Sequence, residues 1–155
     1  MLFAGYLILL AWLITKIRFF TRTGLSSSQL IIVFLLKVMA GILYGWIGVY
    51  YAHMAQMLDT WNYHQQSLVE YSLLRSDPVE FVASFFRSEY DFGYGGSFFS
   101  TENSWWSNLP LNFILKLLGF FNLLSGGNYY INLIFYSFLT LCGPLAIYRV
   151  MKHVS

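Results

Sequence analysis

The sequence predicts an all-α integral membrane protein with three to four transmembrane helices and an external region of short juxtamembrane helices. Hydrophobic residues make up 57% of the chain and charged residues 10%, against about 45–50% and about 25% in an average soluble domain. All seven acidic residues lie in one central stretch, whereas the rest of the chain carries seven Lys or Arg and no acid. This composition excludes a soluble enzyme, a disordered protein and a nucleic-acid-binding domain, because a small soluble domain could not bury so much apolar surface. The expected partner is therefore the lipid bilayer, and no nucleic acid is expected.

The first transmembrane helix is expected at about residues 2–20. Its uncharged apolar run is close to the ~20 residues that a bilayer crossing needs, and the basic side chains at its end can extend toward the headgroups. The connector that follows carries Lys16, Arg18 and Arg22. The positive-inside rule places this connector in the cytoplasm.

The second transmembrane helix is expected at about residues 29–54. Gly41, Gly45 and Gly48 fall on one face of it, where small residues allow another helix to approach closely. Lys37 lies about two turns inside the apolar run. It is predicted to hold a lipid phosphate, to counter a buried acid or to extend toward the cytoplasmic headgroups.

The acidic region, residues 55–108, is expected to lie outside the membrane as short helices. Asp59, Tyr63, Gln66 and Glu70 recur at helical spacing and predict a polar stripe. The tetrapeptide Asp-Pro-Val-Glu at positions 77–80 is typical of a helix start, with a capping Asp followed by Pro at the first helical position.

Residues 109–124 are apolar but short, and predict an interfacial or re-entrant helix. Asn112, Lys116, Gly119 and Asn122 fall on one side of this helix. Such a polar stripe favours a helix in the membrane interface, or one that lines a polar cavity, over a helix surrounded by lipid.

The last transmembrane helix is expected at about residues 128–150, with a kink at Pro144. Arg149 and Lys152 close it with a basic, cytoplasm-like end. If the preceding apolar segment crossed the bilayer, this basic end would fall outside, against the positive-inside rule. We therefore prefer three crossings, with a multi-pass chain in the cell membrane and residues 54–108 on the non-cytoplasmic side.

Few side chains suggest chemistry. Asp59 follows the second helix closely. It is predicted either to accept a proton from a hydroxyl or orient a cation, or to be a helix cap or a solvated surface acid. Arg75 and Arg87 are the only cations of the acidic region, and are predicted to clamp a phosphate or to form surface ion pairs. His53 and His64 lack partners at metal-ligand spacing, so packing is the favoured interpretation and no cofactor is expected; a divalent metal is possible but unsupported.

Three segments carry a resemblance to a known family. They are Asp-Thr-Trp-Asn-Tyr-His at 59–64, Ser-Trp-Trp-Ser-Asn-Leu at 104–109 and Ser-Gly-Gly-Asn-Tyr-Tyr-Ile-Asn at 125–132. These segments resemble uncharacterised multi-pass membrane proteins of Bacteroidetes-type bacteria. The order of features over roughly residues 29–150 is a transmembrane helix, an external loop that opens with an acid, and short juxtamembrane helices that lead into the next span. This order resembles the N-terminal portion of a GT-C-type polytopic membrane glycosyltransferase.

This resemblance implies a function at the outer face of the membrane. The acid of the first external loop, here Asp59, would activate an acceptor hydroxyl for attack on a sugar carried by a polyprenyl-phosphate donor. The residues that would help to bind the substrates are Tyr63, His64, Gln66, Arg75 and Arg87. Such enzymes have more helices than this chain shows, which implies missing C-terminal helices or a small subunit. The alternative hypothesis is a non-catalytic subunit or scaffold that contacts a partner membrane subunit.

Overall fold

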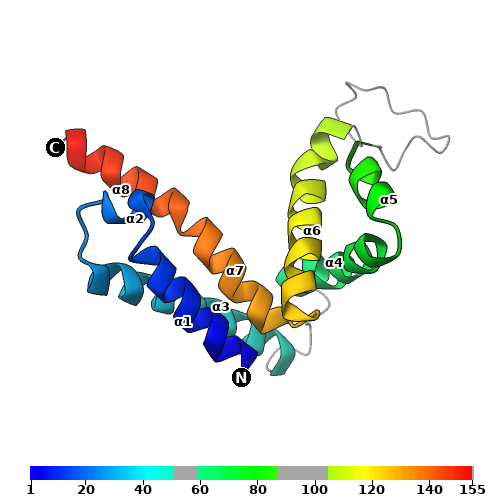
Figure 1. Ribbon diagram of the computed structural model, residues 1–155, viewed down its shortest axis with the longest axis horizontal. Coiled ribbons are helices and arrows are strands. Elements are labelled where there is room, and N and C mark those ends of the chain that lie inside the picture. Colours follow the sequence, from blue (N-terminus) through cyan, green and yellow to red (C-terminus); the bar gives the residue numbers. More distant parts are fainter. Residues whose placement is uncertain (51–58, 87–104, 155) are drawn as a thin grey trace. The chain divides into compact units, whose positions relative to one another are not determined.

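A computed structural model describes residues 1–50, 59–86 and 105–154, and every element in them is a helix (Figure 1). The chain forms two compact units. The first unit consists of Met1–Ala55 and Asn128–Ser155, and the second of Gln56–Gly127. Two helices are long and apolar enough to cross a membrane: Ser27–Tyr50 and Tyr129–Lys152.

The first unit contains five described helices: α1 (Leu2–Ile14), α2 (Arg18–Thr21), α3 (Ser27–Tyr50), α7 (Tyr129–Thr140) and α8 (Cys142–Val154). Instead of one helix over residues 2–20, the chain forms α1 and α2. Ile17 between them adopts an extended conformation, with φ −70° and ψ 126°. The 13 residues of α1 reach only about 20 Å, less than the ~30 Å hydrocarbon core. The described residues thus contain two membrane-length helices rather than the expected three to four.

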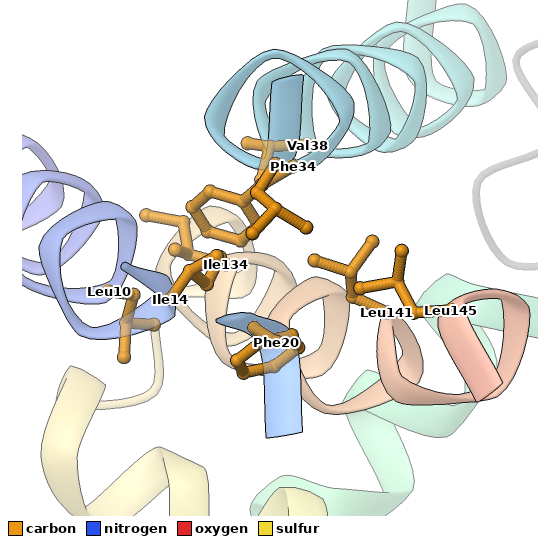
Figure 2. Packing of buried hydrophobic residues seen from close by; sticks show 9 residues of the cluster. Leu10, Ile14, Phe20, Phe34, Val38, Ile134, Leu141 and Leu145 are labelled. Atoms are coloured by element: carbon orange, nitrogen blue, oxygen red, sulfur yellow. The ribbon is translucent and has the colours of Figure 1, made fainter. Parts of the chain in front are cut away.

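The core of the first unit is apolar and joins all of these helices. Figure 2 shows Leu10 and Ile14 of α1, Phe34 and Val38 of α3 and Ile134 of α7 converging on one another. On α3 the buried side chains recur every four residues, so one face of the helix packs inward. The opposite face of α3 exposes large apolar side chains: Ile32, Leu36, Met39, Leu43 and Ile47.

α3 and the α7–α8 segment pack against each other as antiparallel helices. Near the end of α3, a Cβ on Gly45 would lie 2.8 Å from the ring of Tyr129 at the start of α7, and one on Gly41 would lie 2.8 Å from Leu133. Gly48 is also buried. Before the start of α3, Gly24 contacts the ammonium group of Lys152 near the end of α8. The glycine face predicted from the sequence thus lies against a helix of the same chain.

The last membrane-length segment is interrupted at Leu141, between α7 and α8. The cause lies three residues later, because Pro144 has no N–H to bond the carbonyl of Thr140, four residues before it. The Nζ of Lys37 on α3 donates to this carbonyl oxygen at 3.4 Å. The structure adds a contact that was not predicted for Lys37, because its ammonium binds a carbonyl that the proline leaves without its helical donor.

The second unit contains α4 (Asp59–Ser76), α5 (Pro78–Ala83), a 3₁₀ turn (Ser84–Phe86) and α6 (Trp105–Ser125). The predicted helix start is confirmed, because the Asp77 carboxylate accepts a hydrogen bond from the Glu80 N–H at 2.9 Å. α6 begins before the expected position 109 and ends where Gly126 and Gly127 adopt positive φ angles of 65° and 80°. Only glycine adopts such angles readily, so the Gly-Gly pair ends the helix.

Candidate functional site

Five polar residues of the second unit gather where α4 packs on α6. We call this contact the α4–α6 seam; its members are His64, Ser67, Glu70, Lys116 and Asn122. Three members of the stripe predicted on residues 109–124, namely Lys116, Gly119 and Asn122, lie against α4. Gly119, in the middle of this stripe, allows the close approach, because a Cβ there would lie 3.0 Å from the Glu70 Cβ.

Lys116 forms the charged end of the seam. Its Nζ donates to Glu70 Oε2 at 2.5 Å and to Ser84 Oγ at 2.7 Å, and lies 4.3 Å from the centre of the Phe81 ring. The side chains of Lys116 and Glu70 are only 12% and 23% exposed. The ammonium therefore has an ion-pair partner, a hydroxyl acceptor and an aromatic face, and each of these stabilises its charge at a half-buried position.

Asn122 and Ser67 form the neutral part of the seam, and both are fully buried. Asn122 Nδ2 donates to the Ser67 carbonyl at 3.1 Å and to Ser67 Oγ at 2.9 Å. The Ser67 hydroxyl in turn donates to the His64 carbonyl at 2.7 Å. Because buried polar groups are costly without partners, this chain of bonds fixes the register of α4 on α6.

His64 lies one turn further toward the start of α4 and is 6% exposed. Burial lowers its pKa from 6.5, and a hydrogen bond with the backbone of Gly127 acts in the opposite direction. The centre of the Trp61 ring lies 6.0 Å from that of His64, in an edge-to-face arrangement.

Near the end of α6, the Ser125 hydroxyl is buried and has no hydrogen-bond partner among residues 1–50, 59–86 and 105–154.

α6 exposes part of its apolar surface. Phe113, Phe120, Leu123 and Leu124 are exposed, whereas Leu115 and Phe121 are buried and Lys116 and Asn122 lie against α4. In a water-soluble domain the apolar stripe of a helix faces the core, so four large exposed apolar side chains are unusual there. The arrangement suits a helix whose outer face contacts lipid.

Asp59, the candidate base, is the first residue of α4 and lies outside the seam. Its side chain is exposed and forms no ion pair or hydrogen bond in the part of the chain that the structure describes. Tyr63 is half-buried one turn later, and Gln66 Nε2 donates to Asn62 Oδ1 at 3.0 Å. Of the predicted stripe on this helix, only Glu70 reaches α6 through an ion pair.

The remaining candidates do not join the seam. Arg75 is exposed, with its guanidinium 5.8 Å from the Tyr71 ring centre. Arg87 and His53 lie outside the described residues, as do positions 55–58 and 87–104 of the predicted external region. Within residues 1–50, 59–86 and 105–154, no three His, Cys, Asp or Glu side chains gather as metal ligands.

Sequence reasoning missed Ser67 and Ser84, whose hydroxyls bind Asn122 and Lys116. A signal existed for Ser67, because His64, Ser67 and Glu70 follow one another at three-residue spacing and share a helix face. Serine is too common on exposed helices for this spacing alone to single it out. Comparisons with family models, curated proteins and solved structures found no match to this chain.

Proposed function

We propose that the chain is an integral membrane protein that serves as a non-catalytic subunit or scaffold of a membrane protein complex. In this proposal α3 and the α7–α8 segment cross the bilayer, and the second unit is a helical module at the membrane surface. One observation carries the non-catalytic assignment: the ionisable and amide side chains of the α4–α6 seam are bonded to one another and hold the helices together.

The surface of α3 supports the crossing. Only 22% of its apolar window is buried. A core helix of a soluble domain would be covered on most sides by protein. Exposed leucine, isoleucine and methionine side chains instead surround the outer face of α3, as they do on a helix that lipid solvates.

The antiparallel packing of α3 on α7–α8 supports the topology. The end of α3 and the start of α7 lie at one end of the first unit, so the intervening chain leaves and returns on the same side of the membrane. An odd number of crossings between Tyr50 and Tyr129 is incompatible with this geometry. The interfacial placement of α6 is therefore favoured over a crossing, and the positive-inside rule assigns the intervening chain to the non-cytoplasmic side.

The seam supports a structural role for its residues. A proton-transfer group must reach a substrate, and a phosphate-binding cation must be available to an anion. Lys116 already binds Glu70, and the Asn122 amide already binds Ser67. These side chains stabilise the helix pair, which offers a rigid surface to a partner membrane subunit.

The second candidate is the glycosyltransferase that the resemblance implies, and the exposure of Asp59 favours it. Its carboxylate is accessible and has no structural partner in the described residues. In this candidate Asp59 takes the proton of an acceptor hydroxyl. The hydroxyl oxygen then bonds the anomeric carbon of the sugar as the polyprenyl phosphate leaves with the electrons of the broken bond. Tyr63, one turn away, would help to orient the acceptor.

One experiment separates the two candidates. Cells that lack the gene are complemented with the wild type, Asp59→Asn or the control Asp77→Asn, which keeps a good helix cap. Two quantities are measured in isolated membranes: the size of the native complex in mild detergent and the consumption of polyprenyl-phosphate sugar donors.

The scaffold proposal expects a complex larger than the chain, and equal donor consumption for all three proteins. A fall of about 10²–10⁴-fold in donor consumption for Asp59→Asn alone would replace it with the transferase, since general-base catalysis contributes about that factor. A chain that migrates as a monomer, with no donor consumption dependent on it, would contradict both.

A further inference from the structure

We propose that one end of the first unit binds the headgroups of anionic phospholipids. This surface, the basic end, consists of Lys16, Arg18, Arg22, Arg149 and Lys152. The inference rests on the proposed placement of the first unit in a membrane. It adds a ligand class and a binding surface that the scaffold and transferase proposals do not require.

The fold brings these residues together from the two ends of the sequence. Phe20 of α2 is 2% exposed, and its ring centre lies 5.5 Å from that of Phe138 on α7. The Thr23 hydroxyl donates to the Phe20 carbonyl at 2.7 Å and closes the turn after α2. This anchors the short basic helix to the core that Leu145 of α8 also joins.

Gly24 completes the junction between α2 and α8. Its φ of 82° lies in the left-handed region, where residues with a side chain are strained. The ammonium group of Lys152 occupies the space that a Cβ at this position would take. A cation of α8 therefore lies directly beside the turn that follows Arg18 and Arg22, as the neighbouring positions of α2 and α8 in Figure 1 also show.

The first unit contains nothing of opposite charge to balance this surface. Residues 1–55 and 128–155 include six Lys or Arg and no Asp or Glu. Lys37 is the sixth cation and binds the Thr140 carbonyl within the helix pair. The side chains of Lys16, Arg18, Arg22 and Lys152 are exposed. Like charges on one surface repel one another, so an anion that binds among them stabilises the fold.

Exposed aromatic side chains beside the cations indicate a lipid rather than a soluble anion. Trp12 is 55% exposed and lies 6.0 Å from the Lys16 ammonium, and Phe19 is exposed next to Arg18. Trp and other aromatic rings favour the boundary between acyl chains and headgroups. Arginine binds phosphate oxygens through two parallel N–H bonds, which suits a phosphodiester headgroup.

The test uses the full chain in bilayers that contain phosphatidylcholine and phosphatidylglycerol in equal amounts. The protein is extracted in mild detergent, and its bound lipids are quantified by mass spectrometry. Arg22→Gln is compared with Arg75→Gln, since both remove an exposed arginine but Arg75 belongs to the second unit. Carbonate extraction of the starting membranes reports separately whether the chain is integral.

We expect the wild type and Arg75→Gln to retain phosphatidylglycerol preferentially, and Arg22→Gln to lose up to about fivefold of that preference. Raising the salt concentration should reduce the preference of the wild type, because salt screens exposed charges. The inference would be overturned if wild type and Arg22→Gln retained the same lipid ratio, or if salt had no effect on the wild type. It would also be overturned if inorganic phosphate displaced phosphatidylglycerol as well as the lipid itself does at matched ionic strength. A carbonate-soluble chain would instead overturn the membrane placement itself.

Discussion

Lys116 illustrates how one side chain connects three elements of the second unit. It lies on α6, pairs with Glu70 of α4 and donates to Ser84 in the 3₁₀ turn. An ion pair on an open surface contributes little, because water and salt screen it. This pair is only 12% and 23% exposed, so removal of one partner leaves a poorly solvated charge behind.

We therefore expect Lys116→Met to lower the free energy of unfolding of the second unit by about 1–3 kcal/mol, the cost of a half-buried charged group without its partner. Thermal unfolding in a single detergent would measure it. The double variant Lys116→Met/Glu70→Gln should recover part of the loss, because no uncompensated carboxylate remains. A double variant less stable than Lys116→Met alone would show that the ion pair is not the cause.

His64 makes the stability of the chain depend on pH. Its folded pKa lies below 6.5 because burial disfavours the imidazolium form, whereas the unfolded chain titrates near 6.5. Below that value the unfolded state binds more protons than the folded state, so stability is lost as the pH falls from 6.5 to the folded pKa. Above 6.5 both states are neutral and the contribution is constant.

The expected measurement is a melting temperature that falls between about pH 7.5 and pH 5.5 more steeply for the wild type than for His64→Gln. Other titrating groups act equally on both proteins, so the difference isolates the histidine. Parallel pH profiles would show that His64 accepts a proton in the folded state as readily as in the unfolded state.

At the scale of elements, periodicity predicted α6 better than α4. On α6 the stripe of Lys116, Gly119 and Asn122 interrupts an apolar helix, so the polar side was visible and it does face α4. On α4 polar residues lie all round the helix. The predicted stripe through Asp59 and Gln66 is therefore rotated from the buried one, which depends on hydrogen bonds that α6 supplies.

The ends of elements were predictable where a single residue decides them, as with the Asp77 cap and the glycines after α6. The break between α1 and α2 was not, because hydropathy alone carries the apolar run to residue 20. Of the candidate site, the sequence identified Glu70, His64, Lys116 and Asn122 as notable, but not which residues they contact. Those contacts join residues more than forty positions apart, which a local pattern does not encode.

The interruption at Leu141 couples two helices through one carbonyl. Pro144 deprives the Thr140 carbonyl of its helical donor, and Lys37 of α3 supplies another. In a membrane this exchange offsets two unfavourable groups at once, because an unpaired carbonyl and a buried ammonium are each costly in hydrocarbon.

A double-mutant cycle tests this coupling. Lys37→Met should lower the thermal stability of the wild type, whereas in a Pro144→Ala background it should lower it less, since residue 144 then bonds the Thr140 carbonyl itself. The expected coupling free energy is about 0.5–2 kcal/mol, typical of residues that share a partner. Strictly additive effects would show that Lys37 and Pro144 act independently.

At the scale of the whole molecule, the distribution of charge and the direction of the helices are consistent with one membrane topology. The connector before α3 and the end of α8 are basic and lie at one end of the first unit, and the acidic stretch leaves from the other. The antiparallel packing makes the intervening chain leave and return at the same end of the first unit, and in our proposal the positive-inside rule assigns that end to the non-cytoplasmic side.

Single cysteines in a Cys142→Ala background would test this topology in intact cells. Ser76→Cys on α4 should react with a membrane-impermeant maleimide from outside, whereas Ser28→Cys at the start of α3 should react only after permeabilisation. Both serines are exposed, so accessibility within the protein is matched. Labelling of Ser28→Cys in intact cells, with Ser76→Cys protected, would invert the topology.

The polar interior of the second unit has a thermodynamic consequence. Exposure of apolar surface raises the heat capacity on unfolding, whereas exposure of polar surface lowers it. The contacts of Ser67 with Asn122 and of Glu70 with Lys116 lie in the second unit beside the buried Leu115 and Phe121, whereas the core of the first unit is apolar. Unfolding of the second unit should therefore have a smaller heat capacity change per residue than unfolding of a helix pair held by leucine side chains alone, and its stability should decline less on cooling.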